Sequence, residues 1–223
     1  MRDIVLHHAP SDRSIEVLDI GCGTGSLVRL LAVALPRAKI VGIDISFANV
    51  RAAEMEGAPL ECRGRVSFEH ADYLQYQTAP LDLIVTDTVL HFIVGGPMAL
   101  WTKLARDLRP GGLLVACMAY SCAHNRATTV FRRAMRRLRS RPLDAALLAM
   151  SRRIYGDRMD DARLRERTEY MYIPPEQLMT QTVAGEIAPS LGMRRVAQYE
   201  VSSTSVSQLR QRVTVFVKDD GRR

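Results

Sequence analysis

The sequence lacks the features of several protein classes. It has no uninterrupted apolar run of the roughly 20 residues that a membrane-spanning helix needs. Its N-terminus has no long apolar core like that of a secretory signal peptide. Only four cysteines occur in 223 residues, and no two have the Cys-x-x-Cys spacing of a zinc or redox site. We therefore expect a cytoplasmic protein with reduced thiols, no membrane contact and no metal.

Charge of one sign is concentrated in a single segment. Residues 120–174 contain thirteen arginines, no lysine and six acidic residues, so they hold the whole formal excess of +7. Sites for nucleic acids usually combine basic residues with exposed aromatic residues or a reading element, and neither is visible here. Nucleic-acid binding is therefore disfavoured. A solvated helix face and attraction for an anionic substrate or partner both stay open.

The rest of the chain alternates between short apolar runs and amphipathic stretches. We predict strands at 15–20, 39–43, 65–69, 81–86 and 113–118. Helices are expected at 26–35, at 97–108, and from an N-cap at Ser46 to Glu56, with Gly57 as a stop. Such alternation predicts a doubly wound parallel sheet with helices on both faces.

The C-terminal part changes this rhythm. A helix is expected from Pro175 to about Leu191, followed by strands near 194–201 and 211–217 with a short connection. Two strands so close together suggest a hairpin, and hence one antiparallel strand in the sheet. Residues 119–174 interrupt the alternation and carry two or three amphipathic helical patterns, so we expect a helical cap insertion.

Three alternate glycines follow the first predicted strand. The strand runs through Asp19 into Gly21, Gly23 and Gly25, where bare backbone can touch a ligand. The next helix directs its N-terminal amides into the same space. Asp44 ends the second strand about 20 residues past this loop, where a carboxylate can accept both hydroxyls of a ribose. A nucleotide-like ligand is therefore predicted.

These motifs resemble those of class I S-adenosylmethionine-dependent methyltransferases of the small-molecule type. The resemblance rests on the glycine loop, Gly42-Ile43-Asp44, Ala71-Asp72 and the run Leu108-Arg109-Pro110-Gly111-Gly112. It implies a Rossmann-like, mostly parallel sheet of seven strands with helices on both faces, one antiparallel strand near the C-terminus and S-adenosyl-L-methionine as cofactor. That domain would comprise residues 1–118 and 175–223, with the helical cap at 119–174.

The resemblance also assigns residues to the cofactor. Those expected to bind it are Asp19, Gly21, Cys22, Gly23, Gly25, Asp44, Ile45, Asp72, Tyr73, Asp87 and Thr88. Asp19 would lie near the methionine amino group and Asp44 on the ribose hydroxyls. Ile45 would pack on adenine, while Asp72 and the Tyr73 backbone would bond its edge. Asp87 and Thr88 would touch the methionine part.

Three residues are candidates for catalysis. His91 follows the fourth strand, and an imidazole that titrates near neutrality can take a proton from a nucleophile. A buried histidine bonded to backbone is the competing interpretation. Tyr170 and Tyr172, with Tyr120 and Tyr155 as further candidates, could line the acceptor site or face the sulfonium through cation–π attraction. Ordinary packing would explain any one of these tyrosines equally well.

The leading hypothesis is a methyltransferase that acts on a small-molecule substrate. An alternative enzyme would cyclise the cofactor to azetidine-2-carboxylate with release of methylthioadenosine, or transfer its aminocarboxypropyl group. A third possibility is a cofactor-binding scaffold that recruits a partner through the arginine-rich cap. The sequence leaves a monomer and a homodimer equally open.

Overall fold

Seven strands form one mixed sheet in this protein. A computed structural model describes residues 1–155, 161–201 and 208–220, with the strands in the order β3-β2-β1-β4-β5-β7-β6. Their bounds are β1 Ile15–Ile20, β2 Ala38–Asp44, β3 Val66–His70, β4 Leu81–Asp87, β5 Leu108–Ala119, β6 Met193–Glu200 and β7 Gln211–Lys218. Strand β7 is antiparallel to both of its neighbours, and the other pairs are parallel. The predicted seven-stranded, mostly parallel sheet is confirmed.

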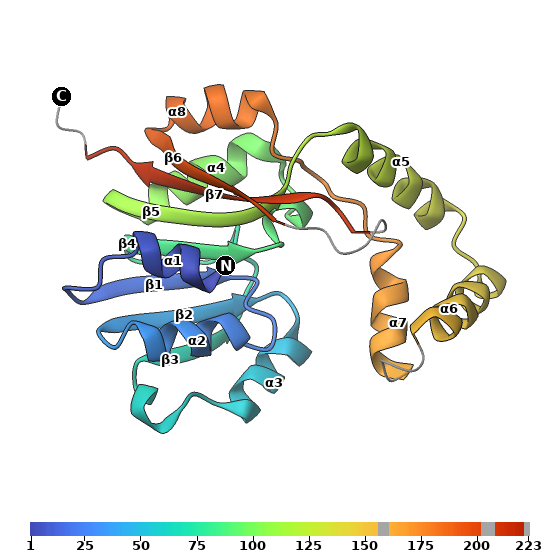
Figure 1. The fold of residues 1–223 in the computed structure, drawn as a ribbon, viewed down its shortest axis with the longest axis horizontal. Coiled ribbons are helices and arrows are strands. Elements are labelled where there is room, and N and C mark those ends of the chain that lie inside the picture. The colour runs from blue at the N-terminus through green and yellow to red at the C-terminus, as the bar shows by residue number, and fades with distance from the viewer. Residues whose placement is uncertain (156–160, 202–207, 221–223) are drawn as a thin grey trace.

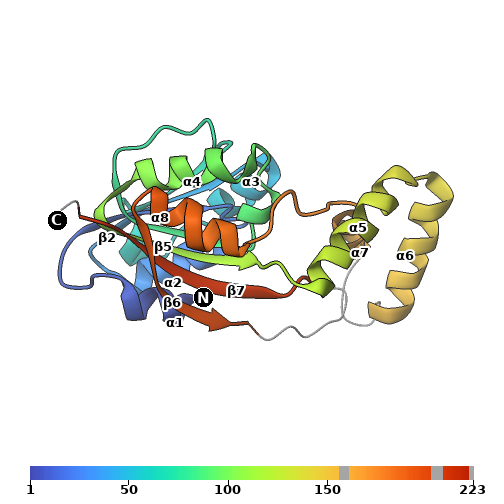
Figure 2. The ribbon, with the colours of Figure 1, turned by 90° about the horizontal axis from the view of Figure 1, so that it is seen from above.

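Helices cover both faces of the sheet (Figures 1 and 2). The helices beside the sheet are α1 Arg2–His8, α2 Ser26–Ala34, α3 Phe47–Glu56 and α4 Gly96–Asp107. Short turns are η1 Leu60–Cys62 and η2 Leu90–Phe92, and a π-helical stretch, η3 Val183–Ile187, continues into α8 Ala188–Ser190. One core cluster contains side chains of α1 and α2, and the other contains side chains of α4, η3 and α8.

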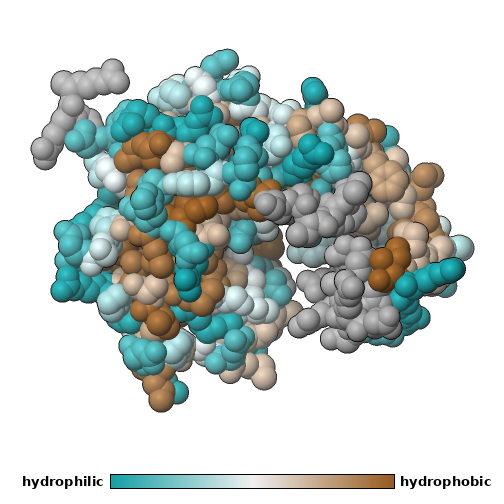
Figure 3. Space-filling model, viewed as in Figure 1, coloured by the Kyte–Doolittle hydropathy of each residue, from teal (hydrophilic) through white to brown (hydrophobic). Residues whose placement is uncertain are grey.

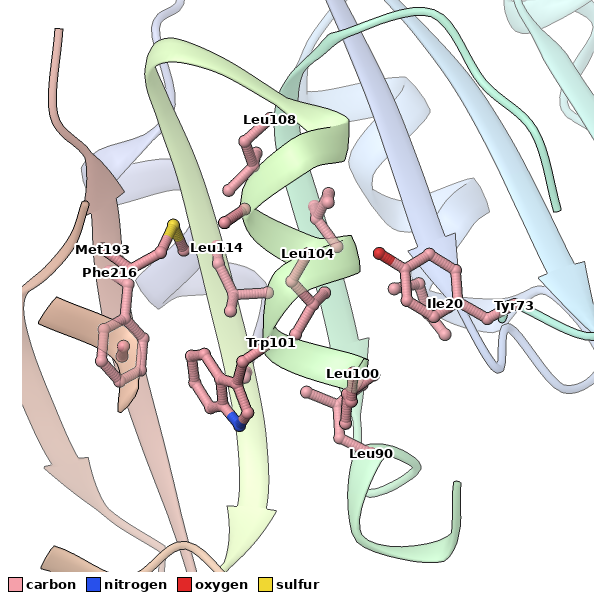
Figure 4. Close-up of a cluster of buried hydrophobic side chains, with 14 of the residues drawn as sticks. Ile20, Tyr73, Leu90, Leu100, Trp101, Leu104, Leu108, Leu114, Met193 and Phe216 are labelled. Carbon is pink, nitrogen blue, oxygen red and sulfur yellow. The ribbon is translucent and has the colours of Figure 1, made fainter. Parts of the chain in front are cut away.

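The core on the α4 side joins the antiparallel end of the sheet to its parallel part. Trp101 of α4 packs edge to face on Phe216 of β7, with ring centroids 5.0 Å apart (Figure 4). Leu104, Leu114 and Met193 surround the pair and are almost completely buried. Burial of large apolar side chains stabilises a fold by about 1.5–3 kcal/mol each. This contact therefore fixes the C-terminal strands on the parallel part of the sheet.

The helix predicted from Pro175 to Leu191 is wrong in its first part. Helical structure begins only at residue 181, and residues 174–180 are irregular. The Met179 amide donates to the carbonyl of Ala119, and the Ser121 amide donates to that of Met179, both at 2.8 Å. These bonds to the end of β5 satisfy backbone groups that a helix would have used internally.

Strand β5 also begins earlier than the predicted residue 113. Leu108 already pairs with Leu81, and the register shifts before Leu83 pairs with Leu113. Residues 109–112 form the irregular part of the strand between these two pairs, and Gly111 adopts a φ of +76° there. The run ends the helix as expected, but it is part of the strand and not a loop before it.

Three helices lie beyond the carboxyl ends of the parallel strands (Figure 1). They are α5 Ala123–Arg137, α6 Arg141–Tyr155 and α7 Asp161–Tyr170, and we call residues 123–173 the helical segment. Arg139 donates to Glu169 (Nη1–Oε2 2.9 Å) and to Asp144 (Nε–Oδ2 3.4 Å), so it links α7 to α6. In the described ranges, no helix has the length and apolar character required to cross a bilayer.

Candidate cofactor site

The glycine loop lies at the carboxyl end of β1. Gly21, Gly23 and Gly25 adopt φ values of +72°, +55° and +82°, which side chains with a Cβ rarely adopt. The Gly21 amide donates to the carbonyl of Ile43 at 2.8 Å, which fixes the loop on β2. A Cβ on Gly21 would lie 2.3 Å from the Val89 side chain. The sequence therefore needs glycine at this position for both shape and space.

Cys22 belongs to this loop but faces the protein interior. Its side chain is buried beside Gly42, where a Cβ would come within 2.9 Å of the Cys22 Cβ. Burial and the nearby Asp19 and Asp44 carboxylates raise the pKa of its thiol to about 12. Cys22 can therefore offer a ligand only its backbone, and its thiol is unreactive at neutral pH.

Asp44 joins the loop to the start of α3. Its Oδ2 accepts a bond from the Gly23 amide at 2.9 Å. Its Oδ1 accepts bonds from the Ser46 amide at 2.8 Å and the Asn49 side chain at 3.4 Å. Ser46 also caps α3, as predicted, by accepting the Asn49 amide. The carboxylate is thus held in a fixed position at the edge of the sheet.

Asp19 is a buried acid without a counter-charge. Only 2% of the residue is exposed, and no described residue donates a hydrogen bond or forms an ion pair with its carboxyl group. Burial, followed by the charges of Asp87 and Asp44, raises the pKa of Asp19 to about 8. The group is therefore largely protonated at neutral pH, and a nearby cation would restore its charge.

A cavity of about 560 Å³ lies between this edge of the sheet and the end of α7. Its lining comprises Ile20, Gly21, Ile43, Asp44, Ile45, Ser46, Asn49, Ala71, Asp72, Tyr73, Val89, Phe92, Ile93, Val94, Glu169, Tyr170 and Ile173. This lining includes three carboxylates and no basic residue. In the orientation of Figure 1, a notch at the surface separates the sheet from the helical segment (Figure 3).

Six of the predicted residues line this cavity: Gly21, Asp44, Ile45, Asp72, Tyr73 and Tyr170. Ile45 is 73% exposed, so its side chain is free to contact a ligand in this cavity. Asp72 accepts the Leu74 amide at 3.0 Å. The Tyr73 ring points into the core towards α4 (Figure 4), with Lys103 Nζ 4.6 Å from its centroid. The Tyr73 backbone is therefore the part that can face a ligand.

Asp87 ends β4 and Thr88 follows it, next to the cavity, but neither residue lines it. Asp87 is close enough to Asp19 to contribute to the raised pKa of that carboxyl group. Thr88 adopts a φ of +66°, which is rare for a β-branched residue and often marks a functional turn. Its amide donates to the carbonyl of Cys117 at 3.0 Å, which holds the turn in place.

His91 lies in η2, behind the cavity wall. The residue is 0% exposed, and neither ring nitrogen has a hydrogen-bond partner among the described residues. Burial and the charge of Arg132 lower the pKa of His91 to about 3. A neutral imidazole with so low a pKa is a weak base. This arrangement therefore does not support the predicted general base, although it leaves both ring nitrogens without partners.

Two other candidate tyrosines, Tyr120 and Tyr172, do not line the cavity. The Tyr172 ring is buried under the guanidinium of Arg139, 4.6 Å from its centroid, and Tyr120 stacks under Arg212 at 3.9 Å. The Tyr155 side chain lies outside the described part of the chain. Tyr170 alone lines the cavity, with its ring 6.4 Å from that of Phe92.

Several lining residues had no individual signal in the sequence. The segment after the fourth strand carries the predicted Thr88 and His91, but nothing in the sequence singled out Val89 and Phe92 as its cavity-lining members. Glu169 and Ile173 come from the helical segment, about 80 residues further along the chain. They reach the site because α7 lies beyond the carboxyl ends of the parallel strands.

Comparisons with known proteins fit this geometry. A sequence model of methyltransferase domains matches residues 17–112, which run from β1 to the start of β5. The chain is 35% identical over 118 residues to the trans-aconitate 2-methyltransferase of Azoarcus sp. (strain BH72), and 36% identical over 101 residues to that of Streptomyces avermitilis. These matches cover 52% and 44% of this chain. They cover 44% and 36% of the relatives, so the chain spans less than half the length of either.

Solved structures resemble the whole fold. Magnesium protoporphyrin IX methyltransferase from Synechocystis PCC 6803 with bound SAH is 18% identical, with a TM-score of 0.61, and the match covers 98% of this chain and 82% of that one. The N-methyltransferase NodS from Bradyrhizobium japonicum WM9 is 19% identical, with a TM-score of 0.59 and coverage of 98% and 94%. Residues 17–112 therefore match a methyltransferase domain, and the chain as a whole has the fold of these methyltransferases.

Proposed function

We propose that this protein transfers a methyl group from S-adenosyl-L-methionine to a small metabolite. The observation that carries the proposal is the charge of the site. Asp19 is buried without a counter-charge, and the neighbouring cavity is lined by carboxylates without a basic residue. Such a site favours a ligand that brings positive charge. S-adenosylmethionine carries both an ammonium group and a sulfonium.

The hydrogen-bond donors and charges of the site also argue against a dinucleotide as the ligand. Sites for pyrophosphate offer backbone amides and often basic side chains to a doubly charged anion. Here the Gly23 amide already donates to Asp44, and the acids of the cavity would repel phosphate. The glycine loop therefore suits close contact with an uncharged or cationic group.

The remaining parts of the cofactor have matching positions in the cavity. We propose that Asp44 holds the ribose hydroxyls and that the exposed Ile45 covers one face of adenine. Asp72 and the Tyr73 backbone lie beside these residues and would bond the edge of the base. Gly21, Gly23, Gly25, Asp87 and Thr88 would surround the methionine part at the ends of β1 and β4. Asp19 would pair with its amino group.

The acceptor would lie between the cofactor and the helical segment. We propose that residues 119–174 form a cap that supplies Glu169, Tyr170 and Ile173 to the shared wall. When bound, the cofactor supplies an electrophilic methyl group. The task of the chain is then to align the acceptor atom and to exclude water. The names of the relatives make trans-aconitate a first candidate acceptor.

Two other functions, a different reaction of the cofactor and a scaffold without turnover, would also need a cofactor site. Cyclisation or aminocarboxypropyl transfer would use the same cofactor, but the named relatives are methyltransferases. A scaffold without turnover would bind the cofactor and stop there. We also propose a cytoplasmic location, since none of the four cysteines forms a disulfide in the structure.

Product analysis distinguishes these functions. The protein is incubated with S-adenosylmethionine alone, with added trans-aconitate, and with a metabolite extract, and the products are identified by mass spectrometry. We expect S-adenosylhomocysteine together with an equal amount of a methylated acid. Methylthioadenosine would show that the alternative enzyme is right, and cofactor binding without any product would indicate a scaffold. Asp44→Ala, which removes the proposed ribose contact, serves as the inactive control.

A further inference from the structure

Arg132 differs from the other arginines of the helical segment. It lies on α5 and is only 8% exposed, whereas every other arginine of this segment with a described side chain is exposed. Its Nη1 donates to the carbonyl of Ile173 at 3.1 Å. No described carboxylate forms an ion pair with it. By contrast, Arg139, just beyond the end of α5, pairs with two acids, Asp144 and Glu169.

His91 is the second member of this buried group. Its ring is completely buried, and among the described residues both nitrogens lack hydrogen-bond partners. Arg132 is the charged group that acts on it, and no acid offsets that charge. A neutral imidazole still offers one N–H donor. Arg132 and His91 therefore place two kinds of donor in one interior region. Among the described residues, the Ile173 carbonyl is the acceptor for Arg132, His91 has none, and no carboxylate pairs with either.

Such an arrangement lowers the stability of a protein that binds nothing there. A buried charge is usually paired, and buried polar atoms are nearly always hydrogen-bonded. A carboxylate would supply what both side chains lack, since it brings a negative charge and two acceptor oxygens. Guanidinium groups bind carboxylates in a planar, two-bond geometry that lysine cannot reproduce.

The pair lies directly behind the wall of the cavity. Phe92 lines the cavity, and its ring centroid is 4.2 Å from that of His91. Ile173 also lines the cavity, and its carbonyl is the group that holds Arg132. A substrate that enters between Phe92 and Ile173 would thus meet Arg132 and His91 at its far end.

We propose that Arg132 and His91 form the binding site for a carboxylate group of the methyl acceptor. Arg132 provides the charge, and His91 donates one ring N–H to the same group. The inference rests on the proposed function, which it refines to an acidic acceptor. His91 thereby becomes a positioning residue and not the base. The exposed arginines of α5 take no part, because water already solvates them.

Calorimetry on protein saturated with S-adenosylhomocysteine tests the site without turnover. Trans-aconitate and citrate are the acidic probes, and the trimethyl ester of trans-aconitate is the neutral one. We expect an acid to bind and the ester not to bind. Arg132→Met should weaken the acid at least about tenfold, because a charge-assisted bond is lost. Arg132→Lys should retain part of the affinity. Arg133→Met, which removes an exposed arginine of the same helix, should leave the affinity unchanged.

Two further readouts separate binding from a merely structural role. The thermal midpoint of Arg132→Met without ligand should not fall below that of the wild type, whereas the shift produced by the acid should disappear. The imidazole nitrogen resonances of His91 should move when acid is added to the wild type and stay in place for Arg132→Met.

The outcomes that overturn the inference are distinct from those that overturn the function. Equal acid affinity in wild type and Arg132→Met, or no binding of either acid to the loaded wild type, would refute the carboxylate site alone. Failure of S-adenosylhomocysteine to bind at all would refute the proposed function, and the carboxylate site would fall with it.

Discussion

At the residue scale, the central feature is a buried carboxyl group to which no described residue donates a hydrogen bond or offers a positive charge. Asp19 gains nothing from folding in its charged form, because burial and the neighbouring acids both disfavour that charge. A structural carboxylate in the same chain has partners of opposite charge: Asp82 pairs with two guanidinium groups. The contrast indicates that Asp19 is placed for a cationic ligand.

The raised pKa of Asp19 predicts how stability depends on pH. The folded state holds a proton up to about pH 8, whereas the unfolded chain releases it near the ordinary value of 3.8. The free energy of unfolding should therefore fall as pH rises between these values, by at most about 1.4 kcal/mol per pH unit. Asp19→Asn should remove this contribution. Urea unfolding of both proteins without cofactor at pH 5, 6, 7 and 8 measures the difference, and parallel curves would contradict it.

Gly21 provides a second prediction at this scale. An alanine there would adopt an unfavourable φ of +72° and meet Val89 at 2.3 Å, so Gly21→Ala should lower stability by about 2–4 kcal/mol. It should also weaken S-adenosylhomocysteine binding. Gly64→Ala is the matched control, because its φ is +83° but nothing lies within 4 Å of an added Cβ. Equal losses in urea unfolding would show that the contact with Val89 is unimportant.

At the scale of elements, one acid joins the amino ends of three strands. Asp82 of β4 accepts the Glu16 amide of β1 at 2.9 Å and binds Arg109 of β5 at 2.7 Å. Arg13, which precedes β1, lies 2.8 Å from its other oxygen. Burial alone would raise the pKa of Asp82, but the Glu16 amide and the two guanidinium groups lower it below its usual value. The cluster therefore stabilises the end of the sheet opposite the cavity.

Replacing this acid should cost stability without affecting the site. Asp82→Ala should lower the free energy of unfolding by about 2 kcal/mol at pH 7, since its two arginine partners are partly solvated. The cost should shrink as pH falls through the depressed pKa of the carboxyl group, because protonation removes the same bonds in the wild type. Urea unfolding at pH 7 and pH 3 measures both values. Glu16→Gln, which alters only a surface pair with Lys39, should have little effect.

The helices and strands also show which parts of the fold could be predicted from the sequence. Strands β1 to β4 and helix α3 were predicted within one or two residues, because their apolar runs, cap and stop are local signals. The helix predicted from Pro175 failed because the amides of Glu176 and Gln177 donate to the carbonyl of His91, more than 80 residues away. No local pattern encodes such a partner. The same holds for β5, whose early start depends on pairing with Leu81.

At the scale of the whole molecule, the site is assembled from two distant parts of the chain. The sequence motifs located the sheet side, and Gly21, Asp44, Ile45, Asp72 and Tyr73 do line the cavity. The opposite wall comes from the helical segment and depends on the position of α7 beyond the carboxyl ends of the strands. The binding and catalytic roles of these lining residues stay predictions. The charge of the helical segment was visible in the sequence, but the burial of Arg132 was not.

Because two distant parts of the chain form the cavity, cofactor binding should slow hydrogen exchange in both of its walls. S-adenosylhomocysteine should slow hydrogen exchange in the glycine loop and also at residues 169–173, since both border one cavity. Exchange followed by mass spectrometry measures the two regions in one experiment. Protection confined to the glycine loop would show that the helical segment does not close on the cofactor. Asp44→Ala should show protection in neither region.

The most direct test of the central claim is calorimetric titration of the purified protein with S-adenosylhomocysteine and, separately, with NAD⁺. The carboxylate-rich cavity, with the buried Asp19 beside it and no described residue to neutralise that acid, should bind the first ligand and not the second. Asp19→Asn should abolish the binding. Binding of NAD⁺, or the absence of any heat with S-adenosylhomocysteine, would contradict the account.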